Sequence, residues 1–123
     1  ERFRRKLEAG AEWAITQPVF DLRALERFFA YMAKNGFKIP VVVGIWPLTS
    51  LKSAQFMRNE IPGIEIPDSV MERMAAAGTP QEGRDMGVEI ARQMCAAVID
   101  DVQGVQLSAP FGRIDLALRV IGK

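Results

Sequence analysis

One phrase recurs three times along the chain and constrains its fold more than any other feature. Each copy starts where a helical segment ends near a glycine, continues as a short apolar strand, is closed by a proline and leads into a new helix. The copies are KLEAGAEWAITQPVFDLRALERFFAYM, AKNGFKIPVVVGIWPLTSLKSAQFM and AAVIDDVQGVQLSAPFGRIDLALRVI. Alternating strands and helices predict an α/β fold with a parallel sheet.

Local signals support this reading of the first two copies. After Asp21, which can cap a helix, apolar side chains recur at helical spacing: Leu22, Leu25, Phe29 and Met32. Gly36 stands where a left-handed residue commonly ends a helix. The segment 13–15 is predicted to be a buried strand. The run 40–45 is apolar without alternation, which is typical of a strand covered on both faces.

Helix-start signals also mark the region between the second and third strands. Thr49 and Ser50 can cap a helix after the second strand. The patterns SVME at 69–72 and TPQE at 79–82 are capping boxes, and they predict two inserted helices. The second of these is expected over 80–99.

Three strands leave two bare sheet edges, which a stable fold has to cover. We therefore expect either self-association or further strands before Glu1. A (β/α)8 barrel typically needs about 250 residues. The 123 residues are predicted to form a single domain, the C-terminal part of a (β/α)8 TIM barrel. An open, doubly wound sheet is the alternative.

Charge and composition exclude several classes of function. Sixteen basic and fifteen acidic residues give a net charge of +1, which offers no electrostatic case for binding nucleic acid or an anionic membrane. The longest apolar stretch, VVVGIWPL, is too short to span a bilayer. The absence of histidine excludes Ser-His-Asp and Cys-His catalysis. The lone cysteine, Cys95, cannot form an internal disulfide and is compatible with a cytoplasmic protein.

Functional residues of parallel α/β folds gather after the carboxyl ends of the strands. The predicted ends are Thr16-Gln17, Gly44-Ile45-Trp46 and the segment from Ser108 to Arg113, which includes Phe111. These groups suit a planar, hydrogen-bonding, partly anionic ligand, and they include no acid–base pair or metal cluster. Two structural alternatives remain open: Gln17 could satisfy a nearby backbone group, and Arg113 could pair with Asp115.

Five stretches in order resemble the C-terminal half of methylenetetrahydrofolate reductase. They are AGAEWAITQPVFD, IPVVVGIWPLTSLKSAQFM, GIEIPDSVMERM, EGRDMGVEIARQM and GVQLSAPFGR, and together they extend over nearly the whole chain. The combination is more specific than any one stretch. The final PFGR is most similar to the branch of the family fused to a homocysteine S-methyltransferase.

The resemblance implies a barrel carrying FAD, which takes hydride from NAD(P)H and reduces 5,10-methylenetetrahydrofolate to 5-methyltetrahydrofolate. It implies that Gln17, in the Thr-Gln motif, contacts the folate pterin. It also places a folate-contacting basic residue after the last strand, at Arg113. Positions that are a second glutamine and a stacking phenylalanine in many relatives are Ser53 and Met57 here, and we expect these two residues to take part in substrate binding.

The resemblance also implies that most flavin contacts and the catalytic acid lie on earlier strands. We therefore expect no catalytic residue in this chain, and neither reductase activity nor good FAD binding from it alone. A non-catalytic half-barrel that assembles with a partner is the second hypothesis. An aldolase or synthase barrel is a third, but it requires a lysine or carboxylate at a strand end, and the predicted ends have none.

Overall fold

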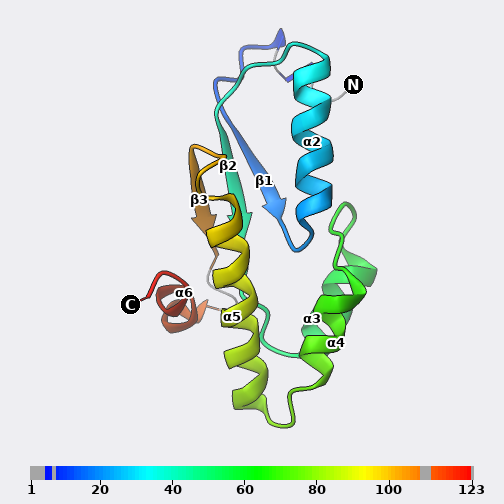
Figure 1. The fold of residues 1–123 in the computed structure, drawn as a ribbon, viewed down its shortest axis with the longest axis vertical. Helices are drawn as coiled ribbons and strands as arrows, with labels where there is room; N and C mark the ends of the chain where they lie inside the picture. Colours follow the sequence, from blue (N-terminus) through cyan, green and yellow to red (C-terminus); the bar gives the residue numbers. More distant parts are fainter. Residues whose placement is uncertain (1–4, 7, 109–111, 123) are drawn as a thin grey trace.

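The computed structural model describes residues 5–6, 8–108 and 112–122. In this part of the chain, three parallel strands alternate with helices (Figure 1). The elements follow one another as β1 (Ala14–Pro18), α2 (Leu22–Lys34), β2 (Val41–Ile45), α3 (Leu51–Glu60), α4 (Asp68–Ala75), α5 (Pro80–Val98), β3 (Gly104–Leu107) and α6 (Ile114–Val120).

The strand order in the sheet is β1-β2-β3, so neighbours in the sheet are also neighbours in the sequence. The central strand pairs with β3 in continuous register, from Val42 opposite Gly104 to Ile45 opposite Leu107. Sequential parallel strands joined by helices are the arrangement of a (β/α)8 barrel. The predicted class, the C-terminal part of such a barrel, is confirmed.

The helices that connect the strands pack on one face of the sheet. Alternate residues of β2, which point to the same side of a strand, bury their side chains there: Val41, Val43 and Ile45. They belong to one apolar cluster with residues of α2, α5 and α6: Leu25, Met32, Val88, Ala91, Val98, Leu116 and Val120. Because α2 and α5 share this face, the alternative of a doubly wound sheet, which has helices on both faces, is wrong.

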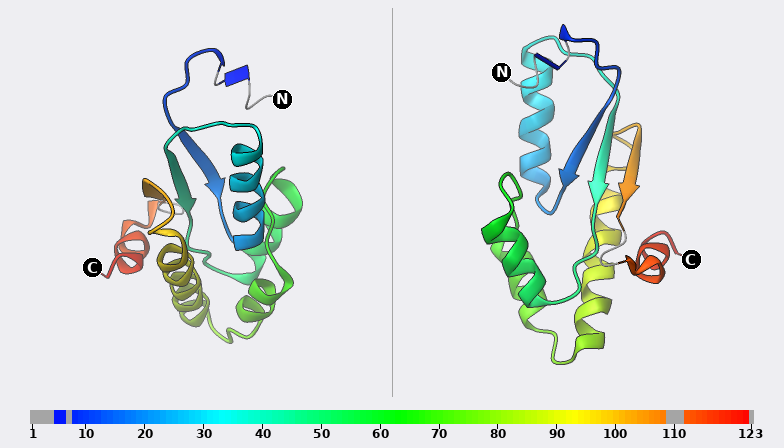
Figure 2. Two further views of the ribbon diagram at one scale, coloured as in Figure 1. Left: turned by 45° about the horizontal axis from the view of Figure 1, so that its top comes forward. Right: turned by 180° about the vertical axis from the view of Figure 1, so that it is seen from behind.

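The opposite face of the sheet is not covered by a described helix. Seen from behind, the strands lie in front of α2 and α5 (Figure 2). The prediction of a buried first strand is therefore wrong, because Trp13 is 56% exposed and Ile15 is 48% exposed on an edge strand. The prediction that the second strand is covered on both faces is also wrong, since Val42 is only half-buried. Inward-facing side chains of a barrel are covered by other strands rather than by helices.

A second apolar cluster lies beyond the carboxyl ends of the strands, where α3, α4 and α5 meet (Figure 1). Its buried members come from these helices and from the loops around them: Phe20, Leu48, Ala54, Met57, Ile64, Ile66, Val70, Met74 and Ile90. Helix α5 contributes to both clusters, through Val88 to the first and Ile90 to the second. It therefore connects the sheet to α3 and α4.

Most predicted helix ends are confirmed. Asp21 caps α2 by accepting from the Arg23 backbone N–H at 3.0 Å, and Gly36 has the expected positive φ of 69°. Thr79 caps α5 by accepting from the Glu82 backbone N–H at 3.1 Å. The predicted cap at Ser69 is wrong, because α4 begins at Asp68, two residues earlier than a cap at Ser69 implies, and no side chain caps it.

Among the described residues, no helix is both long enough and apolar enough to cross a membrane.

Helix α5 crosses the segment after β2 at Gly87, and the contact leaves no room for a side chain. A Cβ added at Gly87 would overlap the carbonyl oxygen of Leu48, which is itself buried. We expect Gly87→Ala to lower the free energy of unfolding by about 3 kcal/mol or more, despite the roughly 1 kcal/mol by which alanine is the better helix former.

Gly104→Ala is the matched control, since the added Cβ would meet nothing within 4 Å. Urea unfolding followed by circular dichroism measures both variants. Equal urea midpoints for the two variants would show that the contact between α5 and Leu48 does not require glycine at position 87.

Candidate functional site

The Thr16-Gln17 pair forms a bulge at the carboxyl end of β1. Ile15 pairs with Val42, but the next pair joins Pro18 to Gly44, so β1 uses one residue more than β2 over the same length. The Thr16 hydroxyl replaces a backbone hydrogen bond that the bulge removes from the ladder. Its Oγ1 accepts from the Gly44 backbone N–H at 3.0 Å and donates to the Gln17 carbonyl oxygen at 2.8 Å.

Gly44 permits this close approach of the two strands. A Cβ at this position would lie 2.7 Å from the Thr16 carbonyl oxygen and 3.2 Å from the Gln17 carbonyl carbon. The ladder resumes beyond the bulge, where the Val19 backbone N–H donates to the Gly44 carbonyl oxygen at 3.0 Å. Bulges re-aim a side chain next to many functional sites, and here the re-aimed side chain is that of Gln17.

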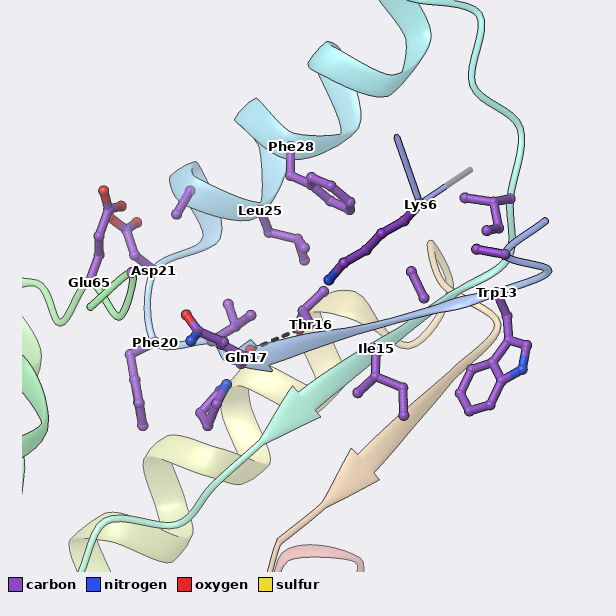
Figure 3. A pocket seen from close by; sticks show the side chains of 17 residues that line it. Lys6, Trp13, Ile15, Thr16, Gln17, Phe20, Asp21, Leu25, Phe28 and Glu65 are labelled. Carbon is purple, nitrogen blue, oxygen red and sulfur yellow. Dashed lines mark hydrogen bonds between the residues drawn. The ribbon is translucent and has the colours of Figure 1, made fainter. Parts of the chain in front are cut away.

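A cavity of about 440 Å³ runs along the free edge of β1. Its apolar wall comes from β1 and the first turns of α2, and includes Leu25 and Phe28 (Figure 3). Its polar groups come from three separate segments of the chain: Lys6, then Thr16, Gln17 and Asp21, and finally Glu65. The volume is in the range of small-ligand sites, which are mostly apolar with a few placed polar groups.

The Gln17 side chain is exposed, and its amide forms no hydrogen bond with the described part of the chain. The alternative that Gln17 satisfies a neighbouring backbone group is therefore wrong: the Thr16 hydroxyl satisfies the strand backbone instead. The amide keeps its two donors and its acceptor available to a ligand.

The other predicted substrate residues do not line this cavity. The Ser53 hydroxyl donates to the Ser50 carbonyl oxygen at 2.9 Å and accepts from the Ser50 backbone N–H at 3.2 Å, while the Ser50 hydroxyl accepts from the Ser53 backbone N–H. This capping box starts α3, so Ser50 is the predicted cap and Thr49 is not. Met57 is 5% exposed and packs within the second apolar cluster.

Arg113 precedes α6, at the opposite edge of the sheet from β1. Its guanidinium makes two hydrogen bonds with the Asp115 carboxylate, Nε to Oδ1 at 3.0 Å and Nη2 to Oδ2 at 2.9 Å. The predicted alternative, pairing with Asp115, is confirmed. The hydrogen bond from Arg113 lowers the pKa of Asp115, and the same bond raises the pKa of Arg113. Pro110 and Phe111, also expected at this strand end, lie outside the described residues.

Sequence reasoning missed Gly63 and Glu65 as parts of the cavity wall. Both lie in the stretch GIEIP, which the resemblance included but to which no role was assigned. Their segment lies between two helices, far in sequence from β1. Only its position in space shows that it reaches the bulge.

Removing the Thr16 hydroxyl tests its role in the bulge. Thr16→Val would leave the Gly44 N–H without its acceptor, and we expect a loss of about 1–3 kcal/mol in the free energy of unfolding. Thr16→Ser keeps the hydroxyl and should be the more stable variant. Urea unfolding compares the two. A valine variant as stable as the serine variant would show that the hydroxyl does not hold the bulge.

The ion pair of Arg113 predicts a pH effect. Because the folded-state pKa of Asp115 lies below its usual value of 3.8, the stabilisation is present at neutral pH and is lost as the pH falls through the folded-state pKa. Arg113→Gln should raise the pKa of Asp115 toward 3.8 in a carboxyl NMR titration. Arg119→Gln is the control: it should raise the pKa of Asp85, its own partner, and leave that of Asp115 unchanged.

The sequence of this chain is similar to those of known proteins from one family. The family model for methylenetetrahydrofolate reductase matches residues 1–109. Methylenetetrahydrofolate reductase 2 of Schizosaccharomyces pombe is 34% identical over 104 residues, which cover 80% of this chain and 16% of that protein. The 5,10-methylenetetrahydrofolate reductase of Buchnera aphidicola is 37% identical over 65 residues, covering 52% of this chain and 21% of that protein. The chain thus spans less than a quarter of the length of these two relatives.

A solved structure shares the fold. An uncharacterized protein from Clostridium thermocellum, described as binding two copies of 5-methyl-5,6,7,8-tetrahydrofolic acid, superposes with a TM-score of 0.57 at 19% identity. The match covers 97% of this chain and 45% of that one. Since the family model spans all but the last fourteen residues, the chain belongs to the methylenetetrahydrofolate reductase family.

Proposed function

We propose that residues 1–123 form one domain, the folate-binding part of a flavin-dependent oxidoreductase that reduces 5,10-methylenetetrahydrofolate to 5-methyltetrahydrofolate with NAD(P)H in the cytoplasm. Membership of the family supports the reaction class. The observation that carries the proposal for this part of the chain is the free amide of Gln17, which the bulge presents at the carboxyl edge of the sheet.

The chemistry of a primary amide suits a pterin. The pyrimidine edge of a pterin carries donors and acceptors side by side, and an amide can donate to one and accept from another. The amide also stays uncharged at every physiological pH, so it adds no charge beside a hydride transfer. The apolar wall next to it, with Leu25 and Phe28, could pack against the flat ring.

The described residues do not fit FAD as a complete site. Lys6 is the single cation among the described residues that line the cavity, and the sequence has no Gly-x-Gly-x-x-Gly turn to receive a diphosphate. We therefore assign most flavin contacts to polypeptide outside residues 1–123.

Arg113 is the proposed contact for the anionic glutamate tail of folate. Its ion pair with Asp115 is exposed on both sides, with side-chain exposures of 46% and 59%. Exposed ion pairs contribute little stability, so the guanidinium can exchange Asp115 for a carboxylate of the ligand. Ser53 and Met57 would act indirectly, by starting α3 and by packing beneath the β1 exit.

Gln17→Ala tests the proposal in the full-length protein, including any polypeptide beyond residues 1–123. We expect the Kd for 5-methyltetrahydrofolate to rise about tenfold, because a hydrogen-bonding group worth about 1.4 kcal/mol is lost. Gln103→Ala is the matched control: it removes an exposed amide that precedes β3, at the amino edge of the sheet. Isothermal titration calorimetry measures both. Unchanged affinity and turnover in Gln17→Ala would show that the amide does not bind folate.

A further inference from the structure

Gly63 lies directly against the Gln17 side chain. A Cβ added at Gly63 would lie 2.6 Å from Gln17 Oε1, 3.6 Å from Cδ and 3.9 Å from Nε2. A distance of 2.6 Å is shorter than any ordinary carbon–oxygen contact, so the amide would have to move. The φ of Gly63 is also positive, at 86°.

The segment that carries Gly63 is held in place by the residues that follow the glycine. Ile64 and Ile66 are buried in the second apolar cluster together with Phe20, which lies in the short segment between β1 and α2. Between them, the Glu65 carboxylate pairs with Arg27 of α2 at 2.6 Å. Phe20 and Arg27 both belong to the β1–α2 unit that carries Gln17. The position of Gly63 relative to the amide is therefore set mainly by packing, because the Arg27–Glu65 pair is exposed and contributes little.

These contacts give Gln17 two supports. The bulge at Thr16 and Gly44 sets where the side chain leaves the backbone. The backbone of Gly63 borders the space in which the amide at its far end lies. A glutamine side chain has three rotatable bonds, and restricting them before a ligand arrives reduces the entropy lost on binding.

We propose that Gly63 is a positioning residue for folate recognition: its missing side chain leaves the space in which the Gln17 amide lies, facing the cavity. The proposal rests on the proposed function of Gln17. Gly63 itself touches no ligand in this mechanism. Any side chain at position 63 displaces the amide from the cavity edge, and folate binding weakens through Gln17 alone.

The test is a double-mutant cycle in the full-length protein, including any polypeptide beyond residues 1–123, with 5-methyltetrahydrofolate as the titrated ligand. Gly63→Ala is expected to raise the Kd about tenfold, as Gln17→Ala does. The double variant should bind as weakly as Gln17→Ala alone, within twofold, since no amide remains to be displaced.

Backbone strain is separated from displacement of the amide by a matched glycine. Gly36 also has a positive φ, of 69°, but a Cβ there would meet nothing within 4 Å. Gly36→Ala should therefore lower stability much as Gly63→Ala does and leave the Kd unchanged. If Gly63→Ala does not fold, Gly63→Asn brings the same Cβ with a residue that tolerates positive φ, and Gly36→Asn becomes its control.

Two results would overturn the proposal. One is a Gly63 variant that binds folate as tightly as the unmodified protein. The other is a Gly63 substitution that weakens binding by the same factor with and without the Gln17 amide, which would mean that Gly63 acts independently of Gln17. Either result leaves the role of Gln17 standing if Gln17→Ala itself weakens binding. If Gln17→Ala binds normally, the proposed function and this proposal are both wrong.

Discussion

The hydrogen bond from the Gly44 backbone N–H to the Thr16 hydroxyl is the interaction on which the site depends. It lets β1 contain an extra residue without leaving a half-buried strand amide unsatisfied, which would cost about 1–3 kcal/mol. Because the threonine satisfies the backbone, the following glutamine does not have to. The two adjacent side chains thus have different roles: Thr16 stabilises the fold, and Gln17 is available for binding.

The one-sided packing of the sheet explains why the candidate site is open. Helices α2, α5 and α6 all contribute to the cluster against Val41, Val43 and Ile45 of β2, as in a barrel whose helices form the outer layer. The uncovered face and the free edge of β1 keep Trp13 and Ile15 exposed and allow the cavity to form beside Gln17. In a closed barrel a further strand pairs with this edge of β1, and other strands cover the inner face.

The second apolar cluster has a functional consequence as well as a structural one. It joins Phe20, at the exit of β1, to Ile64 and Ile66, which follow Gly63. Three motifs that are separate in the sequence, at 16–17, 44–45 and 63–67, therefore meet at one edge of the sheet. The contacts of Gly44 with Thr16 and of Gly63 with Gln17 are close enough that each requires the absence of a side chain.

The residues alone were sufficient for the alternation of strands and helices, for the caps at Asp21 and Thr79, and for placing Gln17 at a strand end, because these depend on neighbours within a few positions. Burial of Trp13 and Ile15 was mispredicted, since an apolar side chain does not encode which face of a sheet receives helices. The bulge and the contact between Gly63 and Gln17 were decided by tertiary structure. Gly63 and Gln17 are 46 positions apart in the sequence, and only the packing of α3, α4 and the β1 exit brings them into contact.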